Sequence, residues 1–285
     1  MKLIHTTLLA LLLAGAAVAQ AKEAVRATSE DEELSIAALE GLMAQPSDRA
    51  LPILKKVLTG SQSTLVKRRA LFVLAQIGNP QARDILMQWA RSPNVEMRRE
   101  AIRGIGIDGD PKSLDALQEI YKAGDADVKK EILKAWMIAG RKEAVYQAAL
   151  NAKSEDEASE AMRMLGVMGA REELRKLGER PGPPRGLLEA FALSGDITSL
   201  RKIADGNGEH SVRVEAVRKL GIIQDDAART ALHEIYTRST DAEIKAAALQ
   251  GMMIAQDEQG VLMFYRAAKT TEEKRALLRT LSMMG

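Results

Sequence analysis

The chain has 285 residues, of which 46% are hydrophobic, 3% aromatic and 28% charged, with 13 Met and no Cys. Sheet cores favour aromatic and β-branched residues, whereas Ala, Leu, Met, Glu, Lys and Arg favour helices, so the composition predicts a helical protein and excludes a disordered one. With 41 basic and 39 acidic residues the net charge is +2, which argues against a nucleic-acid partner because such partners select a basic face.

Residues 1–21 have the pattern of a secretory signal peptide. Lys2 precedes an uncharged Leu/Ala run from Leu8 to Ala19, and small residues allow cleavage after Ala19 or Ala21. An uncleaved anchor is the alternative, which the run disfavours because it is short for a bilayer. We therefore expect a periplasmic or secreted protein without disulfides, with residues 22–30 as a flexible tether and no transmembrane segment in the mature chain.

From Leu34 onward one unit recurs: a helix, a turn and a second helix. The turn residue that ends the first helix is used here as the anchor of each unit. Successive anchors lie 26 to 32 residues apart, which is a period typical of a solenoid built from helix pairs. The anchors are Pro46, Gly78, Gly109, Gly140, Gly169, Gly195, Gln224, Gln256 and Gly285.

Each first helix carries apolar residues eight, seven and four positions before its anchor. Ala70, Leu71 and Leu74 are one such set, and all nine units keep these three positions apolar. This spacing marks the buried stripe of an amphipathic helix. Glycine at the anchor supplies the left-handed conformation that ends a helix, so the turns at Gln224 and Gln256 are expected to be built differently.

The second helices carry a similar stripe four, seven and eight positions after the anchor. Gly260, Met263 and Phe264 form one example. Capping residues then begin the next unit, and the predicted ones are Ser29, Ser154, Thr240 and Thr270 in capping boxes, with Asp127 and Ser211 in equivalent places.

One interruption breaks the repeat at Pro181–Pro184, where three prolines in four residues cannot continue a helix. We interpret it as a bend within a single solenoid at residues 31–285, and a boundary between two domains is the alternative. The fold class predicted is all-α, with eight helix pairs and a final single helix.

A motif of three parts recurs along the chain: Val/Met/Ile-Lys/Arg, then Ala-aliphatic, then Leu-x-x-Ile-Gly-Asn/Asp. This motif resembles HEAT-like repeats of the short bacterial kind, including those of phycobilisome lyase-type proteins. It occurs at Val66-Lys67, Met97-Arg98, Val128-Lys129, Val212-Arg213 and Ile244-Lys245. The resemblance implies a right-handed α–α superhelix whose second helices line a concave side that holds other proteins. It transfers no catalytic residue.

No motif for catalysis, a metal or a cofactor emerges from the sequence. His233-Glu234 begins like a zinc-protease helix, but Thr237 stands where the second histidine is required. The methionines fall mostly in or beside core positions, which favours packing over copper binding. We therefore expect a protein that is not an enzyme and has neither a cofactor nor a metal.

The surface predicted to bind a partner lies nine and ten positions after the anchors, on the second helices. It mixes charges with scattered apolar side chains, as a peptide groove does and as an ordinary surface also does. Its members are Lys55, Met87, Gln88, Glu119, Leu150, His233, Tyr265 and Arg266. The function expected is a protein-binding scaffold of the cell envelope that holds a peptide or protein segment on the concave face. The alternative is a lyase-like or chaperone-type protein acting on a small ligand or cofactor.

Overall fold

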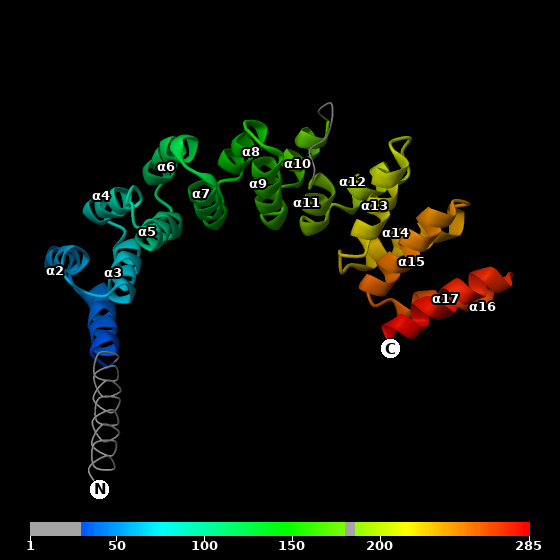
Figure 1. Cartoon of the computed structure of the whole chain (residues 1–285), viewed down its shortest axis with the longest axis horizontal. Helices are drawn as coiled ribbons and strands as arrows, with labels where there is room; N and C mark the ends of the chain where they lie inside the picture. Colours follow the sequence, from blue (N-terminus) through cyan, green and yellow to red (C-terminus); the bar gives the residue numbers. More distant parts are fainter. Residues whose placement is uncertain (1–29, 180–185) are drawn as a thin grey trace, which may run out of the picture. The chain divides into compact units, whose positions relative to one another are not determined.

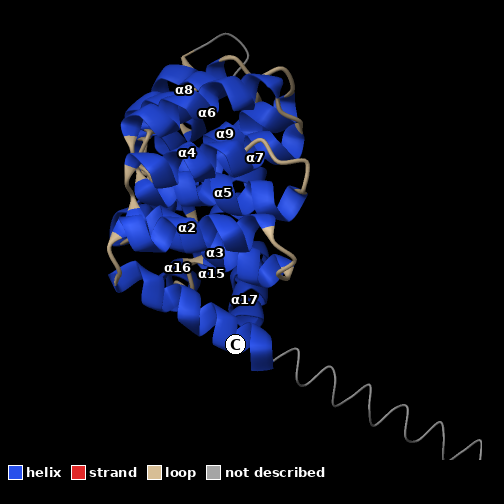
Figure 2. Ribbon diagram, turned by 90° about the vertical axis from the view of Figure 1, so that its left-hand side faces the viewer, coloured by secondary structure: helices blue, strands red, loops and turns tan. Residues whose placement is uncertain are grey.

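The computed structural model describes residues 30–179 and 186–285, and every regular element in these ranges is a helix (Figures 1 and 2). The expected signal peptide, the tether up to residue 29, the cap Ser29 and the bend at Pro181–Pro184 lie outside the described residues. Glu30 already begins a helix. The chain divides into two compact units, each of which contains several of the repeats: Met1–Ala139 (unit 1) and Gly140–Gly285 (unit 2). From here on, unit 1 and unit 2 mean these two parts of the chain, and each is described by itself.

Unit 1 alternates first and second helices. Its elements are a helix at 30–41, η1 (Leu42–Ala44), α2 (Ser47–Thr59), α3 (Thr64–Ile77), α4 (Pro80–Trp89), α5 (Val95–Asp108), α6 (Pro111–Ala123) and α7 (Ala126–Ile138). The helix at 30–41 and helices α3, α5 and α7 are first helices, and α2, α4 and α6 are second helices.

Unit 2 continues the alternation. Its elements are α8 (Lys142–Leu150), α9 (Glu155–Val167), α10 (Arg171–Gly178), α11 (Leu187–Leu193), α12 (Ile197–Ala204), α13 (His210–Leu220), α14 (Asp226–Arg238), α15 (Ala242–Ile254), α16 (Glu258–Ala267) and α17 (Thr271–Met284). The odd-numbered helices here are first helices. The order confirms the all-α class and the predicted succession of helix pairs with a final single helix.

The predicted core positions of the first helices are buried where a helix has neighbours on both sides in its unit, except that Leu188 of α11 is half-buried. In α5, for example, Ala101, Ile102 and Ile105 are at most 1% exposed. The exceptions lie mainly at the chain ends, where Ala38 is exposed and Leu278 is 47% exposed, because a terminal helix lacks one neighbour. The second-helix stripe also fails at the position seven after the anchor in three helices, since Ile53 is 48% exposed, Met263 is 50% exposed and Ala116 is exposed as well.

The turns follow the glycine anchors. Gly78, Gly109, Gly140, Gly169 and Gly195 all have a positive φ, between 60° and 72°. Gln256 adopts the same left-handed conformation with φ 53°, so the expectation of a differently built turn is wrong there. It holds at Gln224, which is not among the positive-φ residues.

The capping predictions are confirmed in part. Ser154 and Thr270 cap α9 and α17 by accepting hydrogen bonds from the backbone N–H groups three residues on. In three other helices the predicted cap is wrong: Asp125 rather than Asp127 caps α7, Asp241 rather than Thr240 caps α15, and α13 begins after Glu209 without a side-chain cap. A carboxylate placed directly before the helix takes precedence over the neighbouring Thr because it accepts a stronger hydrogen bond from backbone N–H.

The first helices form the closely packed layer of each unit. Successive first helices contact one another throughout both units, whereas successive second helices contact one another little. Figure 1 shows this for unit 1, where α3, α5 and α7 line the inner side of the curve and α4 and α6 the outer side. The structure therefore reverses the expectation that second helices line the concave side.

Small residues explain how the first helices approach so closely. The same close contact recurs between successive first helices. It joins the residue three positions before the anchor of one first helix to the residue five positions before the anchor of the next first helix. A Cβ built on Gly106 would lie 2.8 Å from the Cα of Ala135, and one built on Gly221 would lie 2.5 Å from the Cα of Gly251. Glycine at these positions is required because there is no room for a side chain. The full set of pairs is Ala75/Gly104, Gly106/Ala135, Gly166/Ala190 and Gly221/Gly251.

Candidate protein-binding face

The side of each first helix that points away from the second helices carries a repeated pattern. With 100° of rotation per residue, positions nine, six and two before the anchor lie opposite the buried stripe. Position nine is most often Glu, position six most often Arg or Lys, and position two most often aliphatic. Because the first helices lie side by side, these positions form rows across each unit.

The aliphatic position is exposed at the C-terminal ends of five successive first helices of unit 2, within the helix in four of them and in the turn after α13 at Ile222, and we call these five residues the apolar row. Their exposed fractions lie between 42% and 65%. A scattered exposed apolar side chain is ordinary on a protein surface, but recurrence at one position of five neighbouring helices is not. The apolar row consists of Val167, Leu193, Ile222, Ile254 and Met283.

A second row, which we call the arginine row, lies one helical turn away. It consists of Arg163, Arg218 and Arg279 on α9, α13 and α17. Glu160 bonds to the Arg163 guanidinium at 2.7 Å and raises its pKa above the ordinary value, and Glu215 lies 3.4 Å from Arg218. These pairs fix the orientation of two arginines and leave most of their N–H donors available.

The remaining charges of this face are nearly balanced. Glu189, on α11 at the same level as the arginine row, lies 3.6 Å from Lys219 of α13, so its charge is compensated. Among the described residues no hydrogen bond or ion pair involves the guanidinium of Arg279. The basic residues Arg163, Arg218, Lys219 and Arg279 stand against the acidic residues Glu160, Glu189 and Glu215, so the face offers a line of exposed hydrocarbon beside a row of charges whose net charge is +1, left by Arg279.

The same side of unit 1 has a different character. Ile138 is 49% exposed at the apolar position, but α3 places Phe72 at the arginine level, with the Arg69 guanidinium 4.6 Å above its ring. Ion pairs link neighbouring first helices here, Arg68 to Glu100 at 3.2 Å and Arg99 to Glu131 at 3.3 Å. A shallow hollow of about 380 Å³ lies between α3 and α5. Unit 1 thus carries no apolar row of comparable length.

The residues predicted from the sequence as a partner surface lie on the second helices, where the layer is more open. Met87, Leu150 and Tyr265 are half-buried, whereas Lys55, Gln88, Glu119 and Arg266 are exposed. Glu119 pairs with Lys122 of its own helix at 2.8 Å. Lys55, Met87, Gln88 and Glu119 lie on α2, α4 and α6 of unit 1, and these helices make few contacts with one another.

His233 is tied into the repeat stack. Its Nε2 contacts the carboxylate of Asp257, which caps α16 by accepting the Gly260 N–H at 3.0 Å. The ring also packs edge-on against Phe264, with ring centroids 5.3 Å apart. His233 is therefore a contact between α14 and α16.

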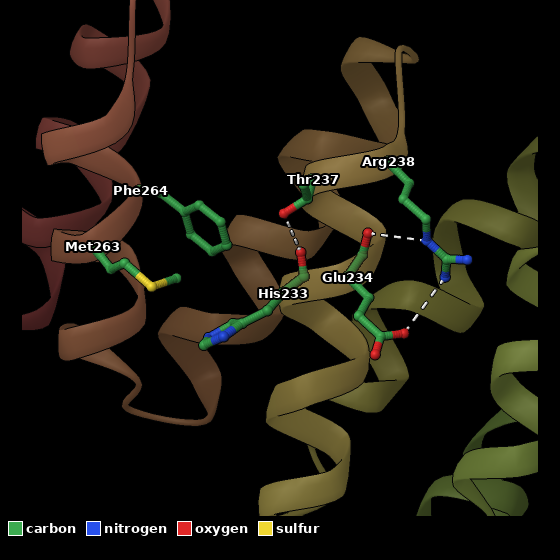
Figure 3. Close-up of a pocket in the computed structure, with 6 residues that line it drawn as sticks. All are labelled: His233, Glu234, Thr237, Arg238, Met263 and Phe264. Atoms are coloured by element: carbon green, nitrogen blue, oxygen red, sulfur yellow. Dashed lines mark hydrogen bonds and ion pairs between the residues drawn. The ribbon is translucent and has the colours of Figure 1, made fainter.

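A hollow of about 360 Å³ adjoins His233 (Figure 3). Phe264 and Met263 of α16 line one side, and Thr237 donates to the His233 carbonyl at 2.8 Å on the other. Glu234 and Arg238 lie at its edge, 3.7 Å apart. Most of its polar groups are paired to one another, and the Arg238 guanidinium, which is 59% exposed, keeps further N–H donors.

A cavity of unit 2 measures about 880 Å³ and lies between α10, α11, α12 and α13. Leu188, Phe191, Ile203 and Val212 supply apolar lining. The charged residues of the lining are balanced, with Arg175, Lys202 and Lys219 against Glu179, Glu189 and Glu215. It has the size of a small-molecule site. Across residues 30–179 and 186–285, no group of three or more His, Cys, Asp or Glu side chains is placed to hold a metal ion.

Sequence reasoning missed the apolar row, although its signal is present in the sequence. An aliphatic residue stands two positions before each anchor from Gly109 onward. The exposed position lies two residues after the buried residue four before the anchor, so in the sequence it resembles a continuation of the core stripe. Only the rotation of the helix separates the two.

Comparison with known proteins finds HEAT-like repeats in both units. Residues 54–136 match the family model described as HEAT repeats, and residues 212–237 match the one described as PBS lyase HEAT-like repeat. A search of curated proteins finds no match. In the part of the chain that the structure describes, no helix is both long and apolar enough to cross a membrane.

Solved structures similar to this chain include human deoxyhypusine hydroxylase in complex with glycerol, with 14% identity, 86% of this chain and 99% of that chain covered, and a TM-score of 0.39. The complex of CpcE and CpcF of phycocyanin lyase from Nostoc matches with 17% identity, 89% and 94% coverage, and a TM-score of 0.37. An engineered protein matches with 20% identity, 82% and 68% coverage, and a TM-score of 0.27.

Proposed function

We propose that the chain is a non-catalytic, protein-binding scaffold that holds a peptide or protein segment on the first-helix face of unit 2. The observation that carries this proposal is the apolar row, which exposes hydrocarbon near the C-terminal ends of α9, α11, α15 and α17 and in the turn directly after α13. Binding surfaces combine large apolar contacts with a polar surround, and the arginine row supplies that surround.

The magnitude fits reversible binding. Burying a whole aliphatic side chain is worth about 1.5 to 3 kcal/mol, and each member of the row has about half of its surface still exposed. Covering one member therefore contributes about 1 kcal/mol, and covering all five about 5 kcal/mol. That sum alone supports weak association, and contacts to the arginines add to it.

Site-specific photo-crosslinking tests the proposal. A photoreactive residue in place of Ile222 or Ile254 should crosslink a partner, while one in place of Met263, equally exposed on second helix α16, should not. With the partner purified, the double variant Ile222→Ser/Ile254→Ser should bind it about 25-fold more weakly, at about fivefold per side chain. Equal crosslinking from Met263, or an unchanged affinity, contradicts the proposal.

We also propose that the protein acts in the cell envelope or outside the cell. The basic start and the apolar run from Leu8 to Ala19 support this, together with the two small-residue cleavage patterns that follow. Mass spectrometry of the chain recovered from the periplasm should give an N-terminus at Gln20 or Lys22. An intact N-terminus on a cytoplasmic chain contradicts export.

A second candidate function is a lyase-like or chaperone-type protein that holds a small ligand or cofactor. The cavity of about 880 Å³ in unit 2 favours it, since its apolar lining suits an apolar molecule and its basic residues Arg175, Lys202 and Lys219 can pair with an anionic group in competition with the acidic residues of the lining. Native mass spectrometry of the protein purified under mild conditions tests this candidate. A bound mass that disappears with Phe191→Trp supports it, and a clean apo mass with no binding of a carboxylated apolar probe contradicts it.

A further inference from the structure

We propose that the partner segment is an extended chain in the polyproline II conformation, with an apolar residue at every third position and acidic residues at one of the two other positions. This inference rests on the proposed function, because it specifies what the apolar row of unit 2 holds. It is carried by the spacing of the row and by the charge beside it.

The spacing follows from the helix packing. Packed helices lie about 8–10 Å apart, and each first helix contributes one member of the row. A Cβ built on Gly166 would lie 2.9 Å from the carbonyl oxygen of Ala190, and Gly221 approaches Gly251 still more closely. These contacts adjoin Val167 and Ile222, so the steps of the row from α9 to α11 and from α13 to α15 lie at the short end of that range.

Polyproline II is the backbone conformation whose repeat matches this step. It has three residues per turn and rises about 3.1 Å per residue, so side chains on one edge recur every 9.3 Å or so. In a β-strand, residues on the same side lie about 6.6 Å apart. This distance is shorter than one step of the row, and twice this distance is longer than one step. In an α-helix with one apolar residue per heptad, the apolar side chains lie about 10.5 Å apart, so over four steps they extend beyond the end of the row.

Charge and width favour the same conformation. The arginine row lies four residues along the helix from the apolar row, or about 6 Å. A partner helix about 10–12 Å wide would cover both rows at once and desolvate the arginines. A polyproline II chain instead has three edges. One edge would lie on the apolar row, a second beside Arg163, Arg218 and Arg279, and the third toward solvent. Acidic side chains on the second edge complement the arginines.

Designed peptides test the inference on the full-length protein by fluorescence anisotropy. The probes are Leu-Pro-Glu and Leu-Glu-Pro repeats, one repeat for each member of the row, since the two orders allow for either chain direction. The comparison peptides are the same residues with Leu respaced at two and four positions, the repeats with Lys in place of Glu, and a Leu/Glu/Ala helix with heptad spacing. At least one period-three acidic peptide should bind tenfold or more tightly than every comparison peptide.

Protein variants then locate the binding. Ile222→Ser and Ile254→Ser should each weaken the period-three peptide about fivefold, and the control Met263→Ser should leave it unchanged. Arg279→Glu should weaken the acidic peptide and strengthen the Lys peptide, because Arg279 is exposed and unpaired in the described structure. Row-dependent binding that prefers the helical peptide overturns this inference and leaves the proposed function standing. Binding indifferent to spacing, or no binding, also overturns the inference, and the crosslinking experiment then judges the proposed function separately.

Discussion

The close approach of the first helices makes Gly106 the sharpest test of the packing. Gly106 lies in the last turn of α5, where replacing Gly with Ala would normally stabilise the helix by up to about 1 kcal/mol. Here the new Cβ would lie 2.8 Å, 2.9 Å and 3.0 Å from the Cα, O and Cβ atoms of Ala135 in α7. Two of these atoms belong to the backbone and cannot rotate away. Overpacking of this kind costs up to about 3 kcal/mol, so Gly106→Ala should destabilise unit 1 by about 2 kcal/mol.

The assay uses the two tryptophans of the chain, Trp89 and Trp136, which both lie in unit 1. Urea unfolding followed by tryptophan fluorescence therefore reports on this unit. The matched control is Gly41→Ala, where the backbone is already helical and no atom lies within 4 Å of the new Cβ. This control should be unchanged or stabilised by about 0.5 kcal/mol. If Gly106→Ala behaves like the control, the first helices do not approach as closely as described.

Three further predictions concern unit 2. Burial of Asp196 alone would raise its pKa, but hydrogen bonds from Arg175, at 2.8 Å, and Ser199 outweigh this and hold the pKa below the ordinary value. The stability that this carboxylate contributes should therefore be present above its unfolded pKa of about 3.9 and be lost as the pH falls through the lowered pKa. In calorimetry, Asp196→Asn should reduce the loss of stability of unit 2 on the acid side. Burial, and secondarily Glu273, raises the pKa of Tyr236 to about 12. The free energy of unfolding of unit 2 should therefore fall by about 2 to 3 kcal/mol between pH 10 and 12, because the unfolded chain ionises first. Tyr236→Phe should remove this loss. His233→Gln should lower the unfolding midpoint of unit 2 without weakening partner binding, and weaker binding at unchanged stability would restore His233 to the partner surface.

Much of the fold was predictable because its determinants are local. The spacing of Ala101, Ile102 and Ile105 marks a buried helix stripe in any context, and glycine at the anchors ends helices through its own φ preference. Gln256 shows the limit of that reasoning. It takes the left-handed conformation without being Gly, so the residue type at the anchor does not by itself decide how the turn is built.

The arrangement of the layers was not predictable from the same patterns. Helical periodicity says which side of a helix is buried, but not which helices stand closest to one another. That depends on small residues such as Gly106 and Gly221 meeting a partner about 30 residues away. Helical periodicity likewise predicts a candidate binding surface on the second helices and does not single out the exposed row that ends at Met283.

The most direct test of the account is hydrogen exchange of the full-length chain with and without its crosslinked partner segment, read by mass spectrometry. We expect protection at the C-terminal turns of α9, α11, α13 and α15 and along α17, where the apolar row lies. The second helices α14 and α16, which carry His233 and Tyr265, should exchange at unchanged rates. Protection confined to α14 and α16, with the apolar row unaffected, would contradict the central claim that the first-helix face of unit 2 holds the partner.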